Sequence, residues 1–514
     1  MSAISTSREP LALERESELR ELAGALLAFV RPKVAYADLL IERVRKAEYQ
    51  RLPGGRELVK PYAARGAMTV RLVDAKGRAL DASFGLRPFA ELRPGLEEAL
   101  SSLWLQEERP GFGLAEVPNR DRVRYGLKGE VDPSSPDLTA SFDALAREVA
   151  ALDEGLSASS GLAVETELWC YAQVEEKLVQ DTEGLVKTQT LPQTFLQLLA
   201  RAKDPRSGRL TQQRTRLGDI RAISWLFEGG PGGGLRADFR EKIGGAGRAA
   251  VGLQRARALS SEELGRLTHL VLAPSAMVFV HEAEGHNFEA DLIKEGQSGL
   301  FTPDGAPRAK PFGAPVVDVW DGPALRPDGS FAEGEGFGSH FIDDEGVEVK
   351  PVRLVERGEI VAKLHDRETA HHFREAPNGR GFSELGQRRL VRMTNTYLHP
   401  AAGAPWLDGL ERLCEGIAFG VYLEGSMGGA VSKEGMSTTV QLGRVIRDGR
   451  LTDELLLPGN LTVRALGSLK GIEAFAGPLR CDDPGFCGKG QMKTVTDGGP
   501  LTRLRKTEDV TLGF

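Results

Sequence analysis

Two histidines and a glutamate carry the strongest chemical signal in this 514-residue sequence. They lie in residues 281–286, His-Glu-Ala-Glu-Gly-His, directly after a short apolar stretch. Neutral imidazole nitrogens bind divalent metal ions, and a carboxylate beside them can take a proton from water as a general base. The segment is therefore a candidate metal site. The alternative is a pair of core or surface histidines on a loop that bind no ion.

The spacing of the two histidines imposes a geometric condition. Side chains five positions apart on an ideal α-helix point about 140° apart, so they cannot share one ion. Gly285, directly before His286, is a suitable place for a π-type bulge or a helix end. We therefore predict that the backbone departs from a regular α-helix between His281 and His286.

A catalytic zinc site usually has three protein ligands and one open position. Cys487 is the best third ligand by local chemistry, because it lies among glycines and Lys489 is near enough in sequence to favour the thiolate. Cys481 could pair with Cys487 as a disulfide or a second metal site, although the two lack a Cys-x-x-Cys spacing. Cys170 and Cys414 lie in apolar surroundings and are predicted to be core residues. The other candidate ligands are His269, His340, His365, His371, His372, His399, Glu289 and Asp291.

Composition and charge exclude several classes of protein. Lysine and arginine number 66 and aspartate and glutamate 73, a net charge of -7, so nothing favours binding to nucleic acid or to anionic lipid. The longest apolar run, residues 270–280, is too short for a membrane-spanning helix of about 20 residues. Four cysteines are too few for a disulfide framework, and the N-terminus lacks the basic region of a signal peptide. We predict a cytoplasmic protein.

The first half of the chain reads as one α+β unit. Apolar residues recur at helical spacing over residues 19–30, and the pattern then changes to alternating strands. We predict one domain, residues 1–260, built on a long antiparallel sheet. Its further expected elements are a hairpin of residues 69–73 and 79–84, helices over 96–105 and 142–152, and strands over 164–179 and onward to 198.

A glycine-rich segment, residues 229–234, precedes the second half. It is interpreted as a solvated linker or as a loop that lets the backbone approach a ligand. It lacks the strand, helix and downstream acid of a dinucleotide site, which excludes a Rossmann fold. Short strands with glycine and aspartate turns follow, so we predict a β-rich second domain, residues 261–514, that carries the metal site. The fold class is therefore α+β with two domains.

Five motifs of the second half occur in the order found in a known family. The sequence resembles the TldD/PmbA family of bacterial and archaeal metallopeptidases, and specifically its metal-carrying TldD branch. The first half matches that family only in general character. The motifs are His281-Glu282-Ala283-Glu284-Gly285-His286 followed by Glu289 and Asp291, Ile342-Asp343-Asp344-Glu345-Gly346, Arg392-Met393-Thr394-Asn395-Thr396, Met427-Gly428-Gly429-Ala430-Val431, and Cys487-Gly488-Lys489.

The resemblance implies a Zn²⁺-dependent peptidase that hydrolyses unfolded peptides inside an enclosed cavity. His281, His286 and Cys487 would be the zinc ligands and Glu282 the general base. Such proteins form homodimers or pair with a metal-free PmbA-like sister subunit. An extended peptide would add as a strand beside a sheet edge.

Several residues near the motifs have weaker predicted roles. Arg392 and Asn395 are candidates for the substrate cleft, together with Gly428 and Gly429, although a strand with outward polar positions explains the first two equally well. Glu289 and Asp291 are candidates for orienting His281 or His286, because a carboxylate can accept the distal ring N–H of a metal-binding histidine. The alternative is that both residues lie on a solvated helix face.

Two further clusters are interpreted mainly as structural. Asp343 and Asp344 could bind a metal, but an ordinary turn is favoured. His371 and His372 lie in a polar helix and are predicted to be surface residues or outer contacts of the site.

Two rival functions remain at this point. One is a non-catalytic partner subunit that binds peptides for a peptidase complex, with a structural metal or none. The other is a metal-dependent hydrolase of a small amide or ester. Glu282 argues for catalysis, because a closed structural site has no use for an acid beside its first ligand.

Overall fold

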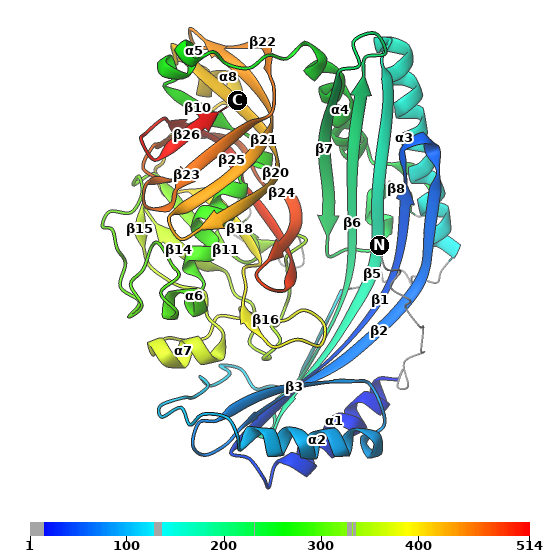
Figure 1. Ribbon diagram of the computed structural model, residues 1–514, viewed down its shortest axis with the longest axis vertical. Helices are drawn as coiled ribbons and strands as arrows, with labels where there is room; N and C mark the ends of the chain where they lie inside the picture. Colours follow the sequence, from blue (N-terminus) through cyan, green and yellow to red (C-terminus); the bar gives the residue numbers. More distant parts are fainter. Residues whose placement is uncertain (1–14, 128–135, 231, 326–330, 333–335, 514) are drawn as a thin grey trace.

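The computed structural model describes residues 15–127, 136–230, 232–325, 331–332 and 336–513. Two large β-sheets dominate these residues (Figure 1). A long, bent sheet from the first half of the chain runs down one side of the molecule. The β-rich second half lies against its upper part. The α+β class with an antiparallel first sheet and a β-rich second part is confirmed.

The first sheet has the strand order β3-β2-β1-β5-β6-β4, and β7 also pairs with β6. Apart from the β4–β6 pair, its strands are antiparallel. Its strands are β1 (Tyr36–Arg51), β2 (Glu57–Val73), β3 (Ala79–Gly85), β4 (Val123–Gly126), β5 (Ala163–Asp181), β6 (Val186–Lys203) and β7 (Leu210–Asp219). The helices of this half are α1 (Glu16–Val30), α2 (Phe89–Leu103), α3 (Pro136–Ser160) and α4 (Ala237–Gly252).

The apolar stripe predicted over residues 19–30 is confirmed by α1. Leu19, Leu22, Leu26 and Val30 are all buried, and they form one core cluster with α2, β1 and β2. Full burial of one such side chain contributes roughly 1.5–3 kcal/mol. The stripe therefore holds α1 against the lower, bent end of the sheet (Figure 1).

Both faces of β5 are buried, and its alternation explains why. The even-numbered Leu168 and Cys170 join the core under α3 and α4, whereas the odd-numbered Trp169 and Tyr171 face the second half of the chain. Successive strand side chains point to opposite faces, so one strand can serve two cores. The prediction that Cys170 is a core residue is confirmed.

The predicted hairpin is also confirmed, and the predicted helices are longer than expected. Val73 pairs with Ala79, and Asp74 closes the turn by accepting the backbone N–H groups of Lys76 and Arg78 at 2.8 and 2.9 Å. The helices predicted from 96 and 142 begin earlier, at Phe89 of α2 and Pro136 of α3; Pro94 lies inside α2, where a proline usually signals a helix boundary.

The glycine-rich segment forms a hairpin turn and contacts none of the candidate ligands. Phe227 of β8 (Phe227–Glu228) pairs with Leu235 of β9 (Gly234–Leu235). Gly229 and Gly230 adopt φ of 76° and 97°, which glycine tolerates best. The segment is therefore the turn of a short hairpin, and residue 231 lies outside the described residues.

The second sheet contains thirteen strands within the described residues, with the main order β15-β14-β11-β18-β25-β10-β20-β21-β23-β26. Its strands are β10 (His269–Leu272), β11 (Val317–Asp321), β14 (Val352–Glu356), β15 (Glu359–Ile360), β18 (Asn395–Pro400), β19 (Trp406–Leu407), β20 (Phe419–Ser432), β21 (Gly435–Arg447), β22 (Arg450–Leu456), β23 (Gly459–Arg464), β24 (Ile472–Gly488), β25 (Met492–Arg505) and β26 (Val510–Gly513). The other elements are α5 (Ser261–Arg266), α6 (Ala290–Lys294), α7 (Arg367–Phe373), α8 (Gly409–Cys414), β12 (Ala324–Leu325), β13 (Phe331–Ala332), β16 (Gly381–Phe382), β17 (Leu390–Val391) and the short turns η1 (Pro53–Gly55), η2 (Ile223–Leu226), η3 (Leu253–Arg255), η4 (Pro274–Ala276), η5 (Val280–Glu284), η6 (Gly285–Phe288) and η7 (Ala465–Gly467).

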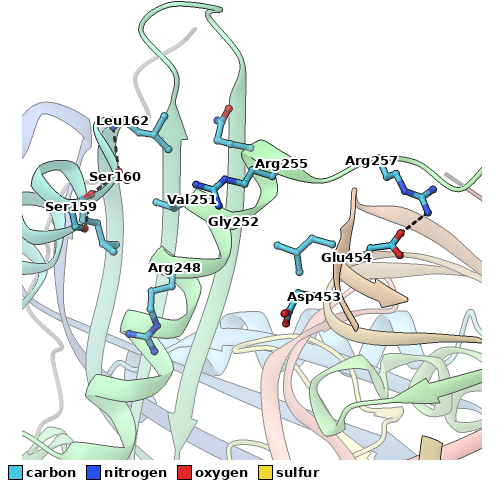
Figure 2. Close-up of a pocket in the computed structure, with 13 residues that line it drawn as sticks. Ser159, Ser160, Leu162, Arg248, Val251, Gly252, Arg255, Arg257, Asp453 and Glu454 are labelled. Atoms are coloured by element: carbon cyan, nitrogen blue, oxygen red, sulfur yellow. Dashed lines mark hydrogen bonds and ion pairs between the residues drawn. The ribbon is translucent and has the colours of Figure 1, made fainter. Parts of the chain in front are cut away.

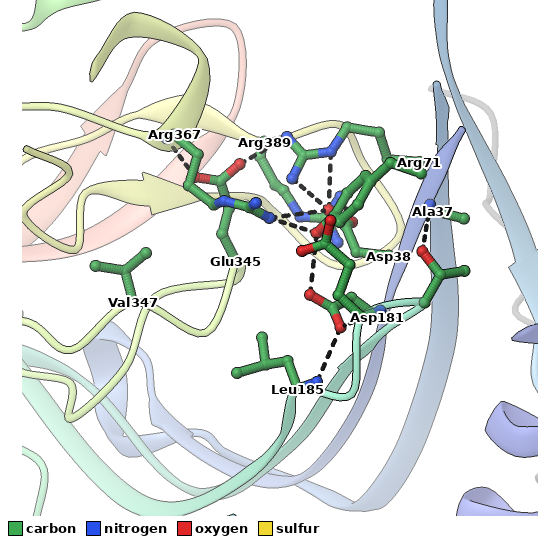
Figure 3. Close-up of polar contacts among 12 residues, drawn as sticks. Ala37, Asp38, Arg71, Asp181, Leu185, Glu345, Val347, Arg367 and Arg389 are labelled. Atoms are coloured by element: carbon green, nitrogen blue, oxygen red, sulfur yellow. Dashed lines mark hydrogen bonds and ion pairs between the residues drawn. The ribbon is translucent and has the colours of Figure 1, made fainter. Parts of the chain in front are cut away.

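A buried ion cluster joins the two halves (Figure 3). Glu345 accepts from Arg71 of β2 at 2.6 Å, and Arg389 lies 2.9 Å from Asp38 of β1. None of these four side chains is more than 8% exposed. The cluster fixes the loop around Glu345 on the lower part of the first sheet.

The two aspartates before Glu345 are hydrogen-bonded to protein groups. Asp343 accepts the backbone N–H groups of Glu345 and Val347, both at 2.9 Å, which is the turn predicted from the sequence. Asp344 accepts from Lys177 of β5 at 2.6 Å. The motif therefore builds a turn and ties it to the first sheet.

The two halves meet at residues 253–260, and we propose the domain boundary between residues 260 and 261. Ser260 caps α5 by accepting the N–H of Glu263 at 3.2 Å, so a new element begins there. Among the described helices, none combines the length and apolar character needed to cross a membrane.

Candidate metal centre

The backbone of the histidine segment is a π-helical turn followed by a 3-10 turn. Residues Val280–Glu284 form the π turn, and the N–H of Gly285 is shared between the carbonyls of Val280 and His281. This wider turn brings His281 and His286 together, with ring centroids 5.1 Å apart. The predicted departure from a regular α-helix is therefore confirmed.

Gly285 is also required by its surroundings. A Cβ atom at this position would lie 1.9 Å from the sulfur of Met393, inside the buried core. The turn can therefore pack only with glycine here, and its packing fixes the two histidines on one side.

Cys487 joins the two histidines from the end of β24. The ligand atoms of His281, His286 and Cys487 all lie within 4.8 Å of one another, and all three residues are buried. The Sγ atom of Cys487 lies 3.3 Å from Nε2 of His286. With Zn–S near 2.3 Å and Zn–N near 2.0 Å, the sulfur and nitrogen of one tetrahedral site lie about 3.5 Å apart. Two imidazoles and a thiolate at this spacing fit zinc.

Each histidine is oriented by a carboxylate on its Nδ1 atom. His286 Nδ1 lies 2.8 Å from Oε2 of Glu289, and His281 Nδ1 lies 2.9 Å from Oδ1 of Asp497 on β25. A carboxylate at Nδ1 leaves Nε2 for a metal ion and raises the basicity of the ring. Glu289 thus occupies its predicted place. Asp291 does not, because it pairs with Lys489 at 2.6 Å instead of with a histidine.

The charges of the three candidate ligands are coupled. Although burial alone would raise the pKa of the Cys487 thiol, His281 and His286 hold it well below its usual value. Burial opposes the charged form of His286, but Glu289 and Cys487 raise its pKa to about 9. The histidines, and not Lys489 as predicted, favour the thiolate. A divalent cation would replace protons at a site that already concentrates negative charge.

A cavity of about 290 Å³ opens beside the three ligands. Glu282 lines it, with Oε2 3.9 Å from Nε2 of His286. Gly429 packs directly on this side chain, since a Cβ there would lie 2.6 Å from Cγ of Glu282. The other residues of the wall are Arg216, Val278, Ser426, Gly428, Ala430, Val431, Asp483, Gly485, Phe486, Gly488, Val495 and Asp497.

Two of the predicted substrate contacts lie elsewhere. Arg392 is 1% exposed and donates to the carbonyls of Cys487 and Gln491 at 2.7 and 2.9 Å. Asn395 is fully buried and donates to Ser339 at 2.8 Å. Both side chains therefore support the scaffold behind the cavity instead of lining it. Gly428 and Gly429 do lie in the wall.

The remaining candidate ligands have partners outside this cluster. His340 contacts the carbonyl of Gly338 at 3.1 Å, His365 lies 3.0 Å from Glu375, and His371 lies 3.2 Å from the carbonyl of Gly111. His269 lies 3.4 Å from Glu473, His399 lies 2.7 Å from the carbonyl of Pro400, and the ring of His372 contacts Phe373 edge to face. None of the four cysteines forms a disulfide, and Cys414 is buried as predicted.

Sequence analysis did not find Asp497 or Arg216. Asp497 lies on β25 and Arg216 on β7, and neither stands near a motif in the chain. Arg216 is half-buried, with Nε 3.2 Å from Gln197 and Nη1 3.4 Å from the carbonyl of Pro484. No local pattern marks either residue, because only strand pairing brings them to the cavity.

A larger cleft of about 660 Å³ lies away from the ligands, between α3 and α4 on one side and β22 on the other (Figure 2). Arg248 and Arg255, both exposed, and Asp453 face it. It contains no candidate metal ligand. Volume alone would therefore favour this cleft, whereas the candidate ligands His281, His286 and Cys487 favour the smaller cavity.

Comparison with known proteins relates the second half of the chain to peptidases. Residues 265–505 match a family model described as the PmbA/TldA metallopeptidase C-terminal domain. A protein of Methanothermobacter thermautotrophicus named "Metalloprotease" is 35% identical over 52% of this chain and 55% of its own length. A "Zinc metalloprotease TldD homolog" of Saccharolobus solfataricus is 29% identical over 46% of this chain and 50% of its own length. The chain thus spans about half the length of the curated relatives it matches.

Two solved structures share the fold of the whole chain. TldE from Thermococcus kodakarensis has a TM-score of 0.71 at 15% identity, covering 95% of this chain and all of that one. A putative modulator of a DNA gyrase from Thermotoga maritima has a TM-score of 0.70 at 17% identity, covering 96% and 99%. At these identities the likeness concerns the fold alone.

Proposed function

We propose that this chain is a zinc-dependent peptidase of the TldD/PmbA family, whose metallopeptidase C-terminal domain its residues 265–505 match. The carrying observation is the convergence of His281, His286 and Cys487 beside Glu282 at one cavity. Three buried ligands facing a cavity favour a catalytic over a closed structural site. Zinc bound there would act as a Lewis acid and lower the pKa of water.

Glu282 is the general base in this proposal. Its side chain is 14% exposed and stands in the cavity wall, 3.9 Å from His286. Burial raises the pKa of Glu282, which moves the carboxylate toward the range where a group takes up and releases protons near neutral pH. Gly429 leaves room for this side chain and holds it from one side.

The wall of the cavity suits an extended peptide. Residues Gly429–Ser432 of β20 pair with β21 on one edge, and no described strand pairs with the other edge of this stretch. A peptide could add there through main-chain hydrogen bonds with little sequence preference. The cavity has a volume of about 290 Å³, far smaller than a folded domain, and Arg216 of the first sheet lines it. We infer that unfolded peptides are the substrates.

The state of assembly and the location are further proposals. We propose that the chain acts as a homodimer or together with a metal-free PmbA-like subunit. A cytoplasmic location agrees with four cysteines that form no disulfide, one of them a candidate thiolate ligand.

Matched variants of the full chain test the proposal. We expect wild type and Glu282→Gln to hold about one zinc per chain, and Glu282→Gln to cleave a long unfolded peptide at least about 100-fold more slowly. Cys487→Ala should lose both zinc and cleavage. Glu284→Gln is the control, because the same chemical change is made two residues away and outside the cavity wall.

Each other outcome has a clear meaning. Wild-type cleavage by Glu282→Gln would remove this residue as the base. Zinc and cleavage retained by Cys487→Ala would remove Cys487 from the site. A wild-type chain with neither zinc nor cleavage would favour a non-catalytic partner subunit. A chain that cleaves small amides but not long peptides would favour the small-amide hydrolase.

A further inference from the structure

Two of the candidate ligands come from segments far apart in the chain. His286 lies on the 3-10 turn η6 and Cys487 at the end of β24, 201 residues later. Their spacing of 3.3 Å therefore depends on contacts that join these two segments. The side chain of Lys489, two residues after Cys487, makes such contacts.

Lys489 reaches from the cysteine hairpin to the histidine turn. Its Nζ atom donates to both carboxylate oxygens of Asp291, at 2.6 and 2.7 Å, and to the carbonyl of Val391 at 3.0 Å. Oε2 of Glu289 lies 3.3 Å from the same Nζ atom. The side chain is 14% exposed, so solvent screens these contacts only weakly.

The contact with Glu289 connects Lys489 to a ligand. The oxygen that faces Lys489, Oε2 of Glu289, is also the one that lies 2.8 Å from Nδ1 of His286. Glu289 is fully buried. The same oxygen of Glu289 therefore contacts the ammonium group of Lys489 and the imidazole of His286.

The backbone of the cysteine hairpin is held by a second cation. Arg392 donates to the carbonyl of Cys487 at 2.7 Å and to that of Gln491 at 2.9 Å, on either side of Lys489. This contact fixes the hairpin against β17 and β18 but does not reach the histidine turn. Among the described contacts of these side chains, those of Lys489 are the ones that link the two segments.

We propose that Lys489 is a positioning residue that ties the Cys487 hairpin to the His286 turn through Glu289 and Asp291. The inference deepens the proposed function, because it rests on the same metal site. Without the ammonium group, the fully buried carboxylate of Glu289 and the partly buried one of Asp291 would remain as neighbouring charges with no cation between them. Glu289 would shift away from its position at His286, and the spacing of the two ligands would loosen.

Zinc affinity of the full chain, measured by competition with a chelator, tests the proposal without any substrate. We expect Lys489→Met to weaken zinc binding about 10- to 100-fold, the usual effect of losing an outer contact of a ligand. Lys489→Arg keeps a cation in reach of both carboxylates and should recover most of the affinity. Lys187→Met is the matched control, since Lys187 is also buried but lies on β6, 3.9 Å from Glu348.

A spectroscopic readout separates positioning from general stability. Co²⁺ in place of zinc gives a thiolate-to-metal charge-transfer band, which we expect Lys489→Met to shift or weaken and Lys489→Arg to restore. If Lys489→Met does not fold, Asp291→Asn removes one carboxylate partner and should still loosen zinc several-fold.

Unchanged zinc affinity and an unchanged cobalt band in Lys489→Met, or in Asp291→Asn if the first variant is unfolded, would overturn the proposal. An equal loss in Lys187→Met would also overturn it, because the effect would then be general. A wild-type chain that binds zinc but cleaves no peptide would refute the proposed peptidase and leave this inference standing. A wild-type chain that binds no zinc would refute both.

Discussion

The buried carboxyl group of Glu284 allows a quantitative test of the metal-site turn. Its side chain is fully buried, and one of its oxygens contacts the hydroxyl of Ser468. The other oxygen has no hydrogen-bond partner among the described residues. Burial raises the pKa of Glu284 from 4.5 to about 8. The folded chain therefore keeps a proton that the unfolded chain releases at neutral pH.

The sign and size of the effect follow from proton linkage. Between the two pKa values the folded state binds more protons, so the free energy of unfolding falls by about 1.4 kcal/mol per pH unit as pH rises. At pH 7 the accumulated cost is about 3 kcal/mol, and above pH 8 it approaches about 5 kcal/mol. Glu284→Gln has no proton to lose. We expect it to match wild type near pH 4 and to be more stable by about 3 kcal/mol at pH 7.

Urea unfolding of the metal-free full chain at several pH values between about 5 and 8 measures this difference. Glu97→Gln, an exposed glutamate on α2, is the control and should show no such trend. The result that would refute the reasoning is a Glu284→Gln variant whose advantage fails to grow with pH. A variant less stable than wild type at pH 8 would mean that the unpaired amide costs more than the ionised carboxylate.

Two further expectations concern residues that only the structure reveals. Asp497→Asn should weaken zinc binding about 10- to 100-fold, because it removes the charge that orients His281. Competition with a chelator measures the zinc affinity, and an unchanged affinity would contradict the expectation. Arg216→Gln should raise KM for peptides about 10-fold with little change in kcat. The guanidinium group of Arg216 lines the cavity and forms no ion pair with a described carboxylate, so it is available to bind substrate. A fall in kcat alone would instead place Arg216 in the reaction.

Local pattern predicted a good part of the fold. The apolar stripe of α1 and the turn at Asp74 were visible because both depend on residues a few positions apart. The bulge between His281 and His286 was predictable for the same reason, since two ligands five positions apart require a turn wider than an α-helix. The starts of α2 and α3 were not predicted; in α2, Pro94 lies inside the helix and interrupts the helical signal of the sequence.

The sequence by itself therefore indicated the candidate ligands, the candidate base and the distortion of the turn that carries them. Tertiary structure alone decided which groups surround them. Asp497 reaches His281 through the register of β25, Arg216 enters the cavity from the other sheet, and Lys489 pairs with carboxylates instead of with the thiolate. These contacts join segments far apart in the chain, and neighbouring residue types carry no record of such pairings.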